Sequence, residues 1–398
     1  MISVDEAQRR IVAAMHRSST ETVALAQAAG RVLAADVASR VTHPPAAVSA
    51  MDGYAVVGAD VHTAPAVLKR VGEAAAGGSY DNPVQRGEAV RIFTGGTLPQ
   101  GTDTVVLQEN AVAEGDVVTV THMTFKGRHV RERGLDFKEG DVLLHAGQCL
   151  GPRQIGLAAA MNVPTVTVRR RPRVAILATG NELIQAGEQL VRNRIVNANG
   201  PALSALVTAA GADAIDLGIA RDDITDLTRA AEQARGCDLL ITLGGASVGE
   251  HDLIQKALGS QGLNVDFWKV AIRPGKPLMF GKLGDMPVLG LPGNPVSAFV
   301  CALMFVRPAI AALQGALAPI QPPLHAALGR ELDANDQRQD YLRSQVERRE
   351  DGALIATPFA KQDSSMLRLL AEAGGLVVRP PHAPPARTGD TVLLHLLG

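Results

Sequence analysis

The sequence contains few aromatic residues and few cysteines. Aromatic side chains make up 3% of it, too few for a protein that stacks the bases of single-stranded nucleic acid on aromatic rings. The three cysteines, Cys149, Cys237 and Cys301, are odd in number and far apart, so they form neither a metal-ligand spacing nor a disulfide framework. Such usage is typical of a protein of the reducing cytoplasm, and we expect a cytoplasmic location.

The sequence also lacks an excess of charge and a long hydrophobic run. Its 39 Lys and Arg residues balance 40 Asp and Glu residues, so it has no general attraction to nucleic acid or membranes. Residues 286–306 carry no charge, but Pro and Gly break the first half and leave about eleven helix-compatible residues, where a membrane span needs about 20. We therefore expect a soluble protein with no nucleic-acid or membrane partner.

Apolar strand-like runs alternate with amphipathic helices between residues 172 and 316. We expect strands at Val174–Leu177, Ala214–Leu217, Leu239–Leu243 and Val288–Leu291, and helices at Pro201–Ala210, Asp223–Ala234, Asp252–Leu258 and Val296–Leu313. This rhythm predicts a three-layer α/β/α domain with a mostly parallel sheet, covered by helices on both faces. Ligands of such domains bind at the carboxyl ends of the strands.

The regions on either side of this domain have a different texture. A helix-rich lead, residues 1–36, is expected to open with a helix whose capping box is Ser3 and Glu6. Residues 43–145 contain short apolar runs separated by Gly and Pro turns, including 142–144, and predict a mostly β unit. After Gln321-Pro-Pro323, alternating strand patterns predict a small β-barrel or a sandwich.

Three loops rich in glycine and proline follow or overlap strand-like runs of the α/β segment. They cover residues 242–252, 273–281 and 290–297, and the first and third lead into helix-like runs. Glycine allows a ligand to approach the backbone closely, and the first N–H groups of a helix have no partner within the helix. Such places bind phosphate and other oxyanions, so the sequence predicts a site for a small anion.

Carboxylates at these strand ends are candidate catalytic residues and metal ligands. Glu182 follows Thr179-Gly180, Asp222 lies at a helix start beside Asp223, and Asp252 ends the first loop. Strand ends in one sheet converge, so these three could share a Mg²⁺ ion with substrate oxygens. Asp222 and Asp252 could instead serve only as helix caps, and for Asp222 both interpretations stay open.

Cations and rigid turns complete the predicted anion site. Lys269, Arg273 and Lys276 flank Pro274-Gly275, and if 267–272 is a strand, Lys269 and Arg273 point to the same face. An exposed polar face is the alternative interpretation of these cations. In the first and third loops we expect substrate-binding roles for Ser247, Gly249, Pro292, Pro295 and Ser297, and Asn294 is expected to cap the helix that follows.

Together with three upstream motifs, these loops give the chain a recognisable family pattern. The upstream motifs are Met-Asp-Gly-Tyr-Ala-Val at 51–56, Phe-Thr-Gly-Gly at 93–96 with Pro99-x-Gly101, and Ala-Thr-Gly-Asn-Glu-Leu at 178–183. In this order and spacing they resemble the molybdopterin molybdenumtransferases, bacterial relatives of the gephyrin E domain. The resemblance extends from about residue 1 to residue 380.

The resemblance implies a fold and an activity. It implies insertion of molybdate into adenylylated molybdopterin with release of AMP and with Mg²⁺ as cofactor. It implies an elongated homodimer, with the molybdopterin adenylyltransferase and cofactor-accepting proteins as further partners. The implied domains are an N-terminal helix at 1–24, an extended linker at 25–42 and 146–171, an inserted β unit at 43–145, the α/β domain at 172–318 and a C-terminal β-barrel at 319–398.

The resemblance also adds residues that their local pattern alone would not single out. It implies a catalytic role for Asp52 and substrate contacts for Thr94, Asp136, Arg343 and Ser364. Around Ser364 the chain departs from the family pattern Gln-Gly-Ser, because Gln362 is followed by Asp363. Two other functions remain as alternatives: a molybdopterin adenylyltransferase, which shares the α/β domain, and a non-catalytic scaffold like gephyrin.

Overall fold

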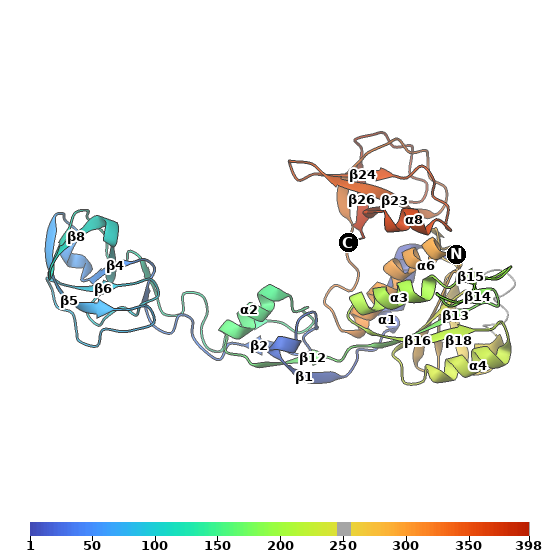
Figure 1. The fold of residues 1–398 in the computed structure, drawn as a ribbon, viewed down its shortest axis with the longest axis horizontal. Coiled ribbons are helices and arrows are strands. Elements are labelled where there is room, and N and C mark those ends of the chain that lie inside the picture. Colours follow the sequence, from blue (N-terminus) through green and yellow to red (C-terminus); the bar gives the residue numbers. More distant parts are fainter. Residues whose placement is uncertain (245–255, 398) are drawn as a thin grey trace.

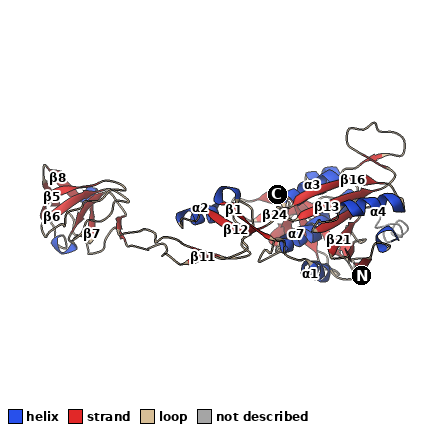
Figure 2. Ribbon diagram, turned by 90° about the horizontal axis from the view of Figure 1, so that it is seen from below, coloured by secondary structure: helices blue, strands red, loops and turns tan. Residues whose placement is uncertain are grey.

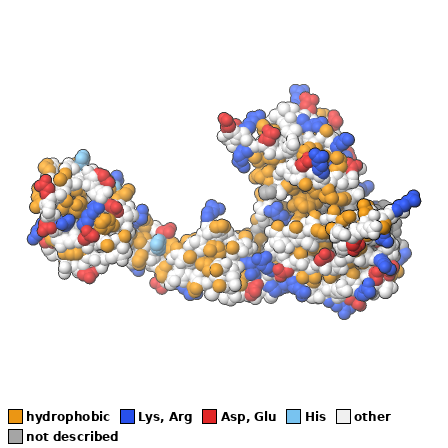
Figure 3. Space-filling model, viewed as in Figure 1, with side chains coloured by type: hydrophobic (Ala, Val, Ile, Leu, Met, Phe, Trp, Pro, Cys, Tyr) orange, Lys and Arg blue, Asp and Glu red, His pale blue; other side chains and the backbone are white. Residues whose placement is uncertain are grey.

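The structure is a computed structural model that describes residues 1–244 and 256–397. The chain is elongated: a β lobe lies at one end, a narrow connection follows, and the α/β domain with a second β unit beside it forms the other end (Figure 1). The space-filling view shows the same outline, with a thin neck beside the β lobe (Figure 3). The predicted site residues Ser247, Gly249 and Asp252 lie outside the described residues.

The β lobe is built on one six-stranded sheet, in the order β7-β4-β6-β5-β9-β8. Tyr54 and Val106 help to fill one of its two small cores, and Val90 and Ile92 the other, so the lobe has apolar packing of its own. The strands are β4 (Gly53–Val56), β5 (Ala66–Ala74), β6 (Glu88–Ile92), β7 (Thr104–Leu107), β8 (Ala111–Glu114) and β9 (Val117–Val120).

The connection pairs segments from before and after the lobe. Strand β1 (Thr20–Ala24) is antiparallel to β12 (Thr165–Arg169), and β2 (Val37–Ala38) pairs with β11 (Val142–Leu144). We expected residues 142–144 to belong to the β unit, but they pair with β2 in the connection. The prediction of a helix-rich lead at 1–36 was also wrong, because its helical residues are limited to α1 (Val4–Ala14) and the 3-10 turn η1 (Leu25–Gln27), and it also contains β1. Helix α2 (Pro152–Ala160) packs over these strands around Leu150 and Met161.

The α/β domain confirms the predicted three-layer fold. Its sheet has the order β16-β13-β17-β21-β20-β18, in which the first four strands are parallel and β20 is antiparallel to both of its neighbours, β21 and β18. Figure 2 shows the helices on both sides of this sheet. The strands are β13 (Arg173–Thr179), β16 (Asp213–Ala220), β17 (Leu239–Leu243), β18 (Leu263–Trp268), β20 (Met279–Leu283) and β21 (Met286–Leu291).

Different helices cover the two faces of the sheet. Helix α1, with α3 (Asn199–Ala209) and the C-terminal helix of the domain, packs on the larger core around Ile176 and Leu289. Helix α4 (Ile224–Gln233) covers the other face through Leu227 and its neighbours. The N-cap of α1 is Ser3, whose Oγ accepts the Glu6 N–H at 3.1 Å, whereas the Glu6 carboxylate bonds to Arg10 rather than completing a capping box.

One continuous helix runs from Pro295 to Leu313. It consists of α6 (Pro295–Cys301), a π-helical turn η4 (Ala302–Val306) and α7 (Arg307–Leu313). Within the described residues it is the one helix long and apolar enough to cross a membrane, but 72% of its apolar window is buried inside the protein. Its composition is therefore accounted for by packing in the core of the domain.

The C-terminal strands form a closed barrel, which decides between the two expected alternatives. The order β23-β24-β22-β26-β25 is closed by pairing of β25 with β23, so none of these five strands is left with an unpaired neighbour. They are β22 (Leu324–Leu328), β23 (Gln339–Arg348), β24 (Leu354–Pro358), β25 (Gly375–Arg379) and β26 (Thr391–Leu396), and α8 (Leu367–Ala371) lies between β24 and β25. A further strand, β19 (Ile272–Arg273), joins the barrel from the α/β domain.

Candidate functional site

A cavity of about 360 Å³ lies at the carboxyl ends of the parallel strands. Thr179 ends β13 and Gly180 follows it, Leu243 ends β17 and Gly244 follows it, and Pro292 follows β21. Two of the predicted carboxylates, Glu182 and Asp222, are in its wall. The other lining residues are Leu183, Ile195, Asn197, Asn199, Pro277, Gly293 and Asn294.

Asp222 and its neighbour Asp223 have different roles. The Asp223 carboxylate caps α4 by accepting the N–H groups of Thr225 at 2.8 Å and Asp226 at 3.0 Å. Asp222 instead accepts the Asn181 N–H at 3.0 Å, and its own N–H donates to the Asn181 side chain at 3.3 Å. Asp223, and not Asp222, is therefore the cap of α4, and Asp222 is a residue of the cavity wall.

Glu182 folds back over the turn that precedes it. A Cβ atom at Gly180 would lie 2.7 Å from both Glu182 carboxylate oxygens, and Gly180 has φ of +149°. A larger side chain at position 180 would thus displace the carboxylate. The absence of a side chain at Gly180 therefore permits the Thr179–Glu182 turn to place the Glu182 carboxylate beside the cavity.

The donor set in the cavity fits a hard cation that keeps most of its ligands from water or substrate. Mg²⁺ is commonly bound by one or two carboxylates plus phosphate oxygens, and Glu182 and Asp222 can supply such carboxylates. Among residues 1–244 and 256–397 no group of three His, Cys, Asp or Glu residues is arranged to hold a metal. The third predicted ligand, Asp252, lies outside that range.

The three predicted cationic residues lie in different environments. Lys269 and Lys276 are exposed, and neither forms an ion pair with another described residue. Lys276 directly precedes Pro277 of the cavity wall. Lys269 does not lie in a strand running from 267 to 272, as we had expected: β18 ends at Trp268, Lys269 has φ of +145°, and β19 begins at Ile272. Strand alternation therefore does not place Lys269 and Arg273 on one face.

The Arg273 guanidinium points into the C-terminal barrel. It donates to Asp340 through Nε at 2.7 Å and through a second, short bond, and to Asp336 at 2.9 Å and Asn335 at 3.0 Å. The bond to Asp340 raises the pKa of Arg273. Contrary to our expectation for an anion-binding residue, most of its donors already have partners.

The turn that leads into α6 is placed by contacts from two directions. Asn199 Nδ2 donates to the Gly293 carbonyl at 2.7 Å, and the Val296 N–H donates to the Ser364 carbonyl at 3.0 Å. Asn294 occupies the N-cap position but its side chain makes no capping bond, unlike the prediction. Of the predicted residues here, Pro292 lines the cavity, whereas Pro295 and the buried Ser297 are not part of its wall.

In the barrel, the buried Arg343 side chain holds the partly exposed 362–366 loop. Arg343 is 1% exposed and donates to the carbonyls of Asp363 at 2.9 Å and Met366 at 3.0 Å, so its side chain is not among those lining the cavity. The side chain of Asp363 accepts the Ser365 N–H and hydroxyl, which lowers the pKa of Asp363. Its charge is thus compensated locally. Ser364 meets the α/β domain through its main chain.

The remaining predicted residues belong to the β lobe and to the connection. Asp52 Oδ1 accepts both the N–H and the hydroxyl of Thr94 at 2.8 Å, which lowers the pKa of Asp52. Asp136 is exposed, and its N–H donates to the His43 carbonyl at 3.1 Å. The Asp52–Thr94 pair lies in the turns before β4 and after β6, and these strands are far from β13 and β14 (Leu183–Ile184) in Figure 1.

Sequence reasoning missed two residues beside these predicted groups. Arg91 lies over the rings of Tyr54 at 5.3 Å and Phe93 at 4.8 Å, and it donates to the Gly53 carbonyl at 3.2 Å. Asn199 supports the Gly293 turn, as described above. For Arg91 the available signal was its position just before the Phe93–Gly96 motif, whereas Asn199 lies next to none of the motifs.

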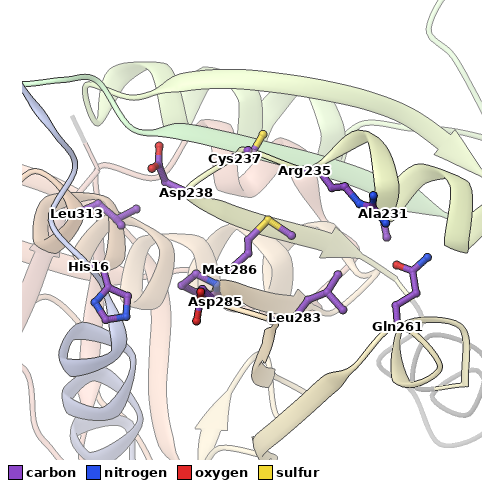
Figure 4. A pocket seen from close by; sticks show the side chains of 13 residues that line it. His16, Ala231, Arg235, Cys237, Asp238, Gln261, Leu283, Asp285, Met286 and Leu313 are labelled. Carbon is purple, nitrogen blue, oxygen red and sulfur yellow. The ribbon is translucent and has the colours of Figure 1, made fainter.

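A second cavity, of about 510 Å³, lies at the opposite end of the sheet (Figure 4). It is lined by residues that precede β17 and β21, including Cys237, Asp238 and Asp285, and by His16 after α1. Burial raises the pKa of the Cys237 thiol. None of the predicted site residues within the described ranges lines it, whereas Glu182, Asp222 and Pro292 line the cavity at the carboxyl ends, which is therefore the candidate site.

Three family models match successive parts of the chain. The MoeA N-terminal region (domain I and II) matches residues 2–162, a probable molybdopterin binding domain matches 175–312, and the MoeA C-terminal region (domain IV) matches 325–397. The molybdopterin-binding match contains all the described residues that line the candidate cavity.

Relatives and solved structures extend over the same length. The molybdopterin molybdenumtransferase of Haemophilus influenzae is 34% identical over 100% of both chains, and that of Nostoc sp. is 38% identical over 82% of this chain and 77% of its own. The crystal structure of the molybdopterin biosynthesis moeA protein from Pyrococcus horikoshii OT3 has a TM-score of 0.87 at 28% identity and covers 100% of both chains. The chain belongs to the molybdopterin molybdenumtransferase family.

Proposed function

We propose that this protein inserts molybdenum from molybdate into adenylylated molybdopterin and releases AMP, the final step of molybdenum cofactor biosynthesis. The main support is that similarity to molybdenumtransferases extends over the whole chain and coincides with a cavity at the carboxyl ends of the parallel strands. The substrate contains a pyrophosphate. Such a group suits a site that combines glycine turns, exposed lysines and carboxylates able to hold a cation.

The lysines and turns are proposed to bind the substrate. Lys276 adjoins the cavity wall, and both Lys276 and Lys269 lack an ion-pair partner among the described residues, so their ammonium groups can pair with oxyanions. Pro292 and Gly293 shape the floor of the cavity at the end of β21. We include Ser247, Gly249, Pro295 and Ser297 in this group on the family resemblance.

Glu182, Asp222 and Asp252 are the residues that we infer would hold Mg²⁺. When bound, the ion would neutralise the charge that develops on the phosphate oxygens as AMP leaves. The support from the structure is that Glu182 and Asp222 are both in the cavity wall, and that Asp223 leaves Asp222 free of the helix cap. A site that takes some of its ligands from the substrate needs few protein carboxylates.

We infer further that the working protein is a homodimer with a shared site. Asp52 and Thr94 belong to turns of the β lobe, at the far end of the elongated chain from the cavity (Figure 1), and Asp136 adjoins the connection. A twofold dimer can bring the lobe of one chain to the cavity of the other and create two such sites. This arrangement would give the lobe residues access to substrate without bending the chain.

The chemistry also points to partners and a location. An adenylylated substrate must come from an adenylyl-transfer step, and a labile metal cofactor must pass to an acceptor, so we infer contacts with the adenylyltransferase and with cofactor-accepting proteins. All three cysteines are free thiols and form no disulfide. Free thiols and the buried apolar helix support a cytoplasmic enzyme.

The test is an assay of the purified protein with adenylylated molybdopterin, molybdate and MgCl₂. We expect AMP release and formation of molybdenum cofactor, detected by chromatography and by reconstitution of a cofactor-free molybdoenzyme. A reaction in which molybdopterin and ATP instead yield adenylylated molybdopterin would assign the chain to the preceding step. Capture of one stoichiometric protein partner without either reaction would favour the scaffold.

A further inference from the structure

The segment 269–277 is shared between the α/β domain and the barrel. It connects β18 and β20 of the α/β sheet, yet its own short strand β19 pairs in parallel with β23, with Ile272 opposite Gln339 and Arg273 opposite Asp340. The Gln339 N–H donates to the Ala271 carbonyl at 2.9 Å, and the Val270 N–H donates to the Lys276 carbonyl at 3.1 Å. The segment is therefore a loop closed on itself and joined to the barrel by its backbone.

Arg273 extends this joint through its side chain. Its bonds to Asp340, Asp336 and Asn335 use four of the five N–H donors of the guanidinium. Asp340 is 4% exposed, so its carboxylate has lost most of its contact with water and depends on this two-pronged partner. A lysine could offer only a single point of charge at the same place.

The barrel side of the joint is itself held firmly. Asn335 accepts Arg273 with its Oδ1, while its Nδ2 donates to the carbonyls of Arg338 at 2.7 Å, Arg379 at 3.0 Å and Pro380 at 2.8 Å. These carbonyls belong to residues before β23 and at and after the end of β25. Arg273 is thus anchored to two strands of the closed barrel and not to a single loose loop.

The other side of the segment contacts the helix that starts at the cavity. A Cβ atom at Gly275 would lie 2.3 Å from the Cys301 Sγ of α6, and the Cys301 thiol donates to the Gly275 carbonyl at 3.6 Å. Two residues further on, Pro277 is part of the cavity wall. Lys276 therefore lies between a glycine that contacts α6 and a proline of the cavity wall.

We propose that Arg273 is a positioning residue: it docks the barrel onto the segment 269–277 and thereby holds Lys276 and Pro277 in place at the cavity. The proposal rests on the proposed function for the reaction that is measured. It assigns the anion contact to Lys276. Asp340, which is in the barrel and outside the cavity wall, contributes by holding the Arg273 guanidinium.

A double-mutant cycle between Arg273 and Asp340 tests the proposal. We expect Arg273→Ala and Asp340→Asn each to lower kcat/KM, the double variant to be no worse than Arg273→Ala, and the coupling to be about tenfold. Arg273→Lys should recover activity only in part, because the charge remains but the fork is lost. The control is Arg338→Ala, which removes an ion pair to Asp336 on the same loop and should leave kcat/KM unchanged.

Direct binding of substrate by Arg273 predicts a different result. Arg273→Ala would then raise KM and weaken its salt dependence, whereas Asp340→Asn would have little effect and the two changes would be additive. A lower melting temperature with unchanged kcat and KM in both variants would mean that the pair only stabilises the fold. Either result overturns the proposal.

Hydrogen exchange of the free protein separates docking from the reaction. If Arg273 docks the barrel, both Arg273→Ala and Asp340→Asn should speed amide exchange at 269–277 as well as at 335–340, with β4–β9 unaffected. Unchanged exchange at 269–277 would contradict the docking role. Because no substrate is present, this measurement remains valid even if the assay shows that the proposed reaction is wrong.

Discussion

Asp52 and Thr94 are 42 residues apart in sequence, and a single carboxylate oxygen of Asp52 accepts both the N–H and the hydroxyl of Thr94 at 2.8 Å. The two bonds join the turn before β4 to the turn after β6, and the Arg91 guanidinium over Tyr54 and Phe93 supports the same corner. They stabilise the ionised form of Asp52, since both donors point at the charged oxygen.

Replacement of Thr94 should move the acid limb of the pH–activity profile. The Thr94 N–H and hydroxyl lower the pKa of Asp52, so the group is ionised above that lowered value and loses its charge as the pH falls through it. Thr94→Val keeps the N–H but removes the hydroxyl, so the pKa should rise part of the way toward its usual value. NMR titration of Asp52 and the profile of kcat/KM should both shift to higher pH; an unchanged titration would exclude this role of the hydroxyl.

The neighbours Asp222 and Asp223 should separate activity from stability. Asp222→Asn is expected to lower kcat/KM by roughly a hundredfold or more, because charge at a metal and phosphate site contributes several kcal/mol to the transition state. Asp223→Ala should leave activity intact and cost about 0.5–2 kcal/mol of unfolding free energy through loss of the α4 cap. Urea unfolding and steady-state assays of both variants measure the difference, and a reversed pattern would refute the assignment.

Removal of either exposed lysine should weaken substrate binding. We expect Lys276→Ala to cost about 1.5–3 kcal/mol of binding free energy, the range for a hydrogen bond to a charged group, and Lys269→Ala to have an effect in the same direction. The affinity of both variants should depend less on salt. Titration calorimetry at two salt concentrations checks this. The control is Lys282→Ala, because Lys282 pairs with Pro287 near the start of β21, at the opposite end of that strand from the cavity. Equal affinities for Lys276→Ala and the control would identify Lys276 as a solvated surface residue.

A side chain at Gly275 should disturb the joint between the segment 269–277 and α6. The added Cβ would overlap Cys301 Sγ at 2.3 Å, and the φ of +116° is unfavourable for any other residue. Gly275→Ala should therefore destabilise the protein by about 1–3 kcal/mol, as overpacking does. Adding Cys301→Ala should restore part of the loss by removing the overlap. Thermal unfolding of the single and double variants provides the measurement, and strictly additive effects would mean that the two groups do not meet.

Mixed dimers should recover activity if the site is shared between subunits. Asp52→Ala and Asp222→Ala proteins, each inactive alone, are unfolded together and refolded, so that half of the dimers are mixed. Each mixed dimer has both lesions in one site and none in the other, and about one quarter of wild-type activity is expected. Mixed dimers verified by mass spectrometry that stay inactive would place both residues in one subunit's site or exclude Asp52 from the reaction.

Local sequence was sufficient for elements whose burial follows a simple period. The strand predictions at Val174–Leu177, Leu239–Leu243 and Val288–Leu291 are confirmed by β13, β17 and β21, because strands buried on both faces are continuous apolar runs. Parallel strands end at one edge of a sheet, which is why Glu182, Asp222 and Pro292 could be expected to meet before their contacts were known. The Ser3 cap of α1 depends only on residues three apart.

Tertiary structure decided what depends on partners distant in the chain. Pairing of β25 with β23 closed the barrel, and pairing of β11 with β2 placed residues 142–144 in the connection. The loop around Arg273 predicts an anion ligand, but the Arg273 side chain donates hydrogen bonds to Asp340 and Asn335, more than 60 residues away in the sequence. Sequence spacing determines which residue types lie near a turn. The direction of a long, flexible side chain depends on which buried carboxylate the fold brings within reach, and only the packing of barrel against α/β domain determines that.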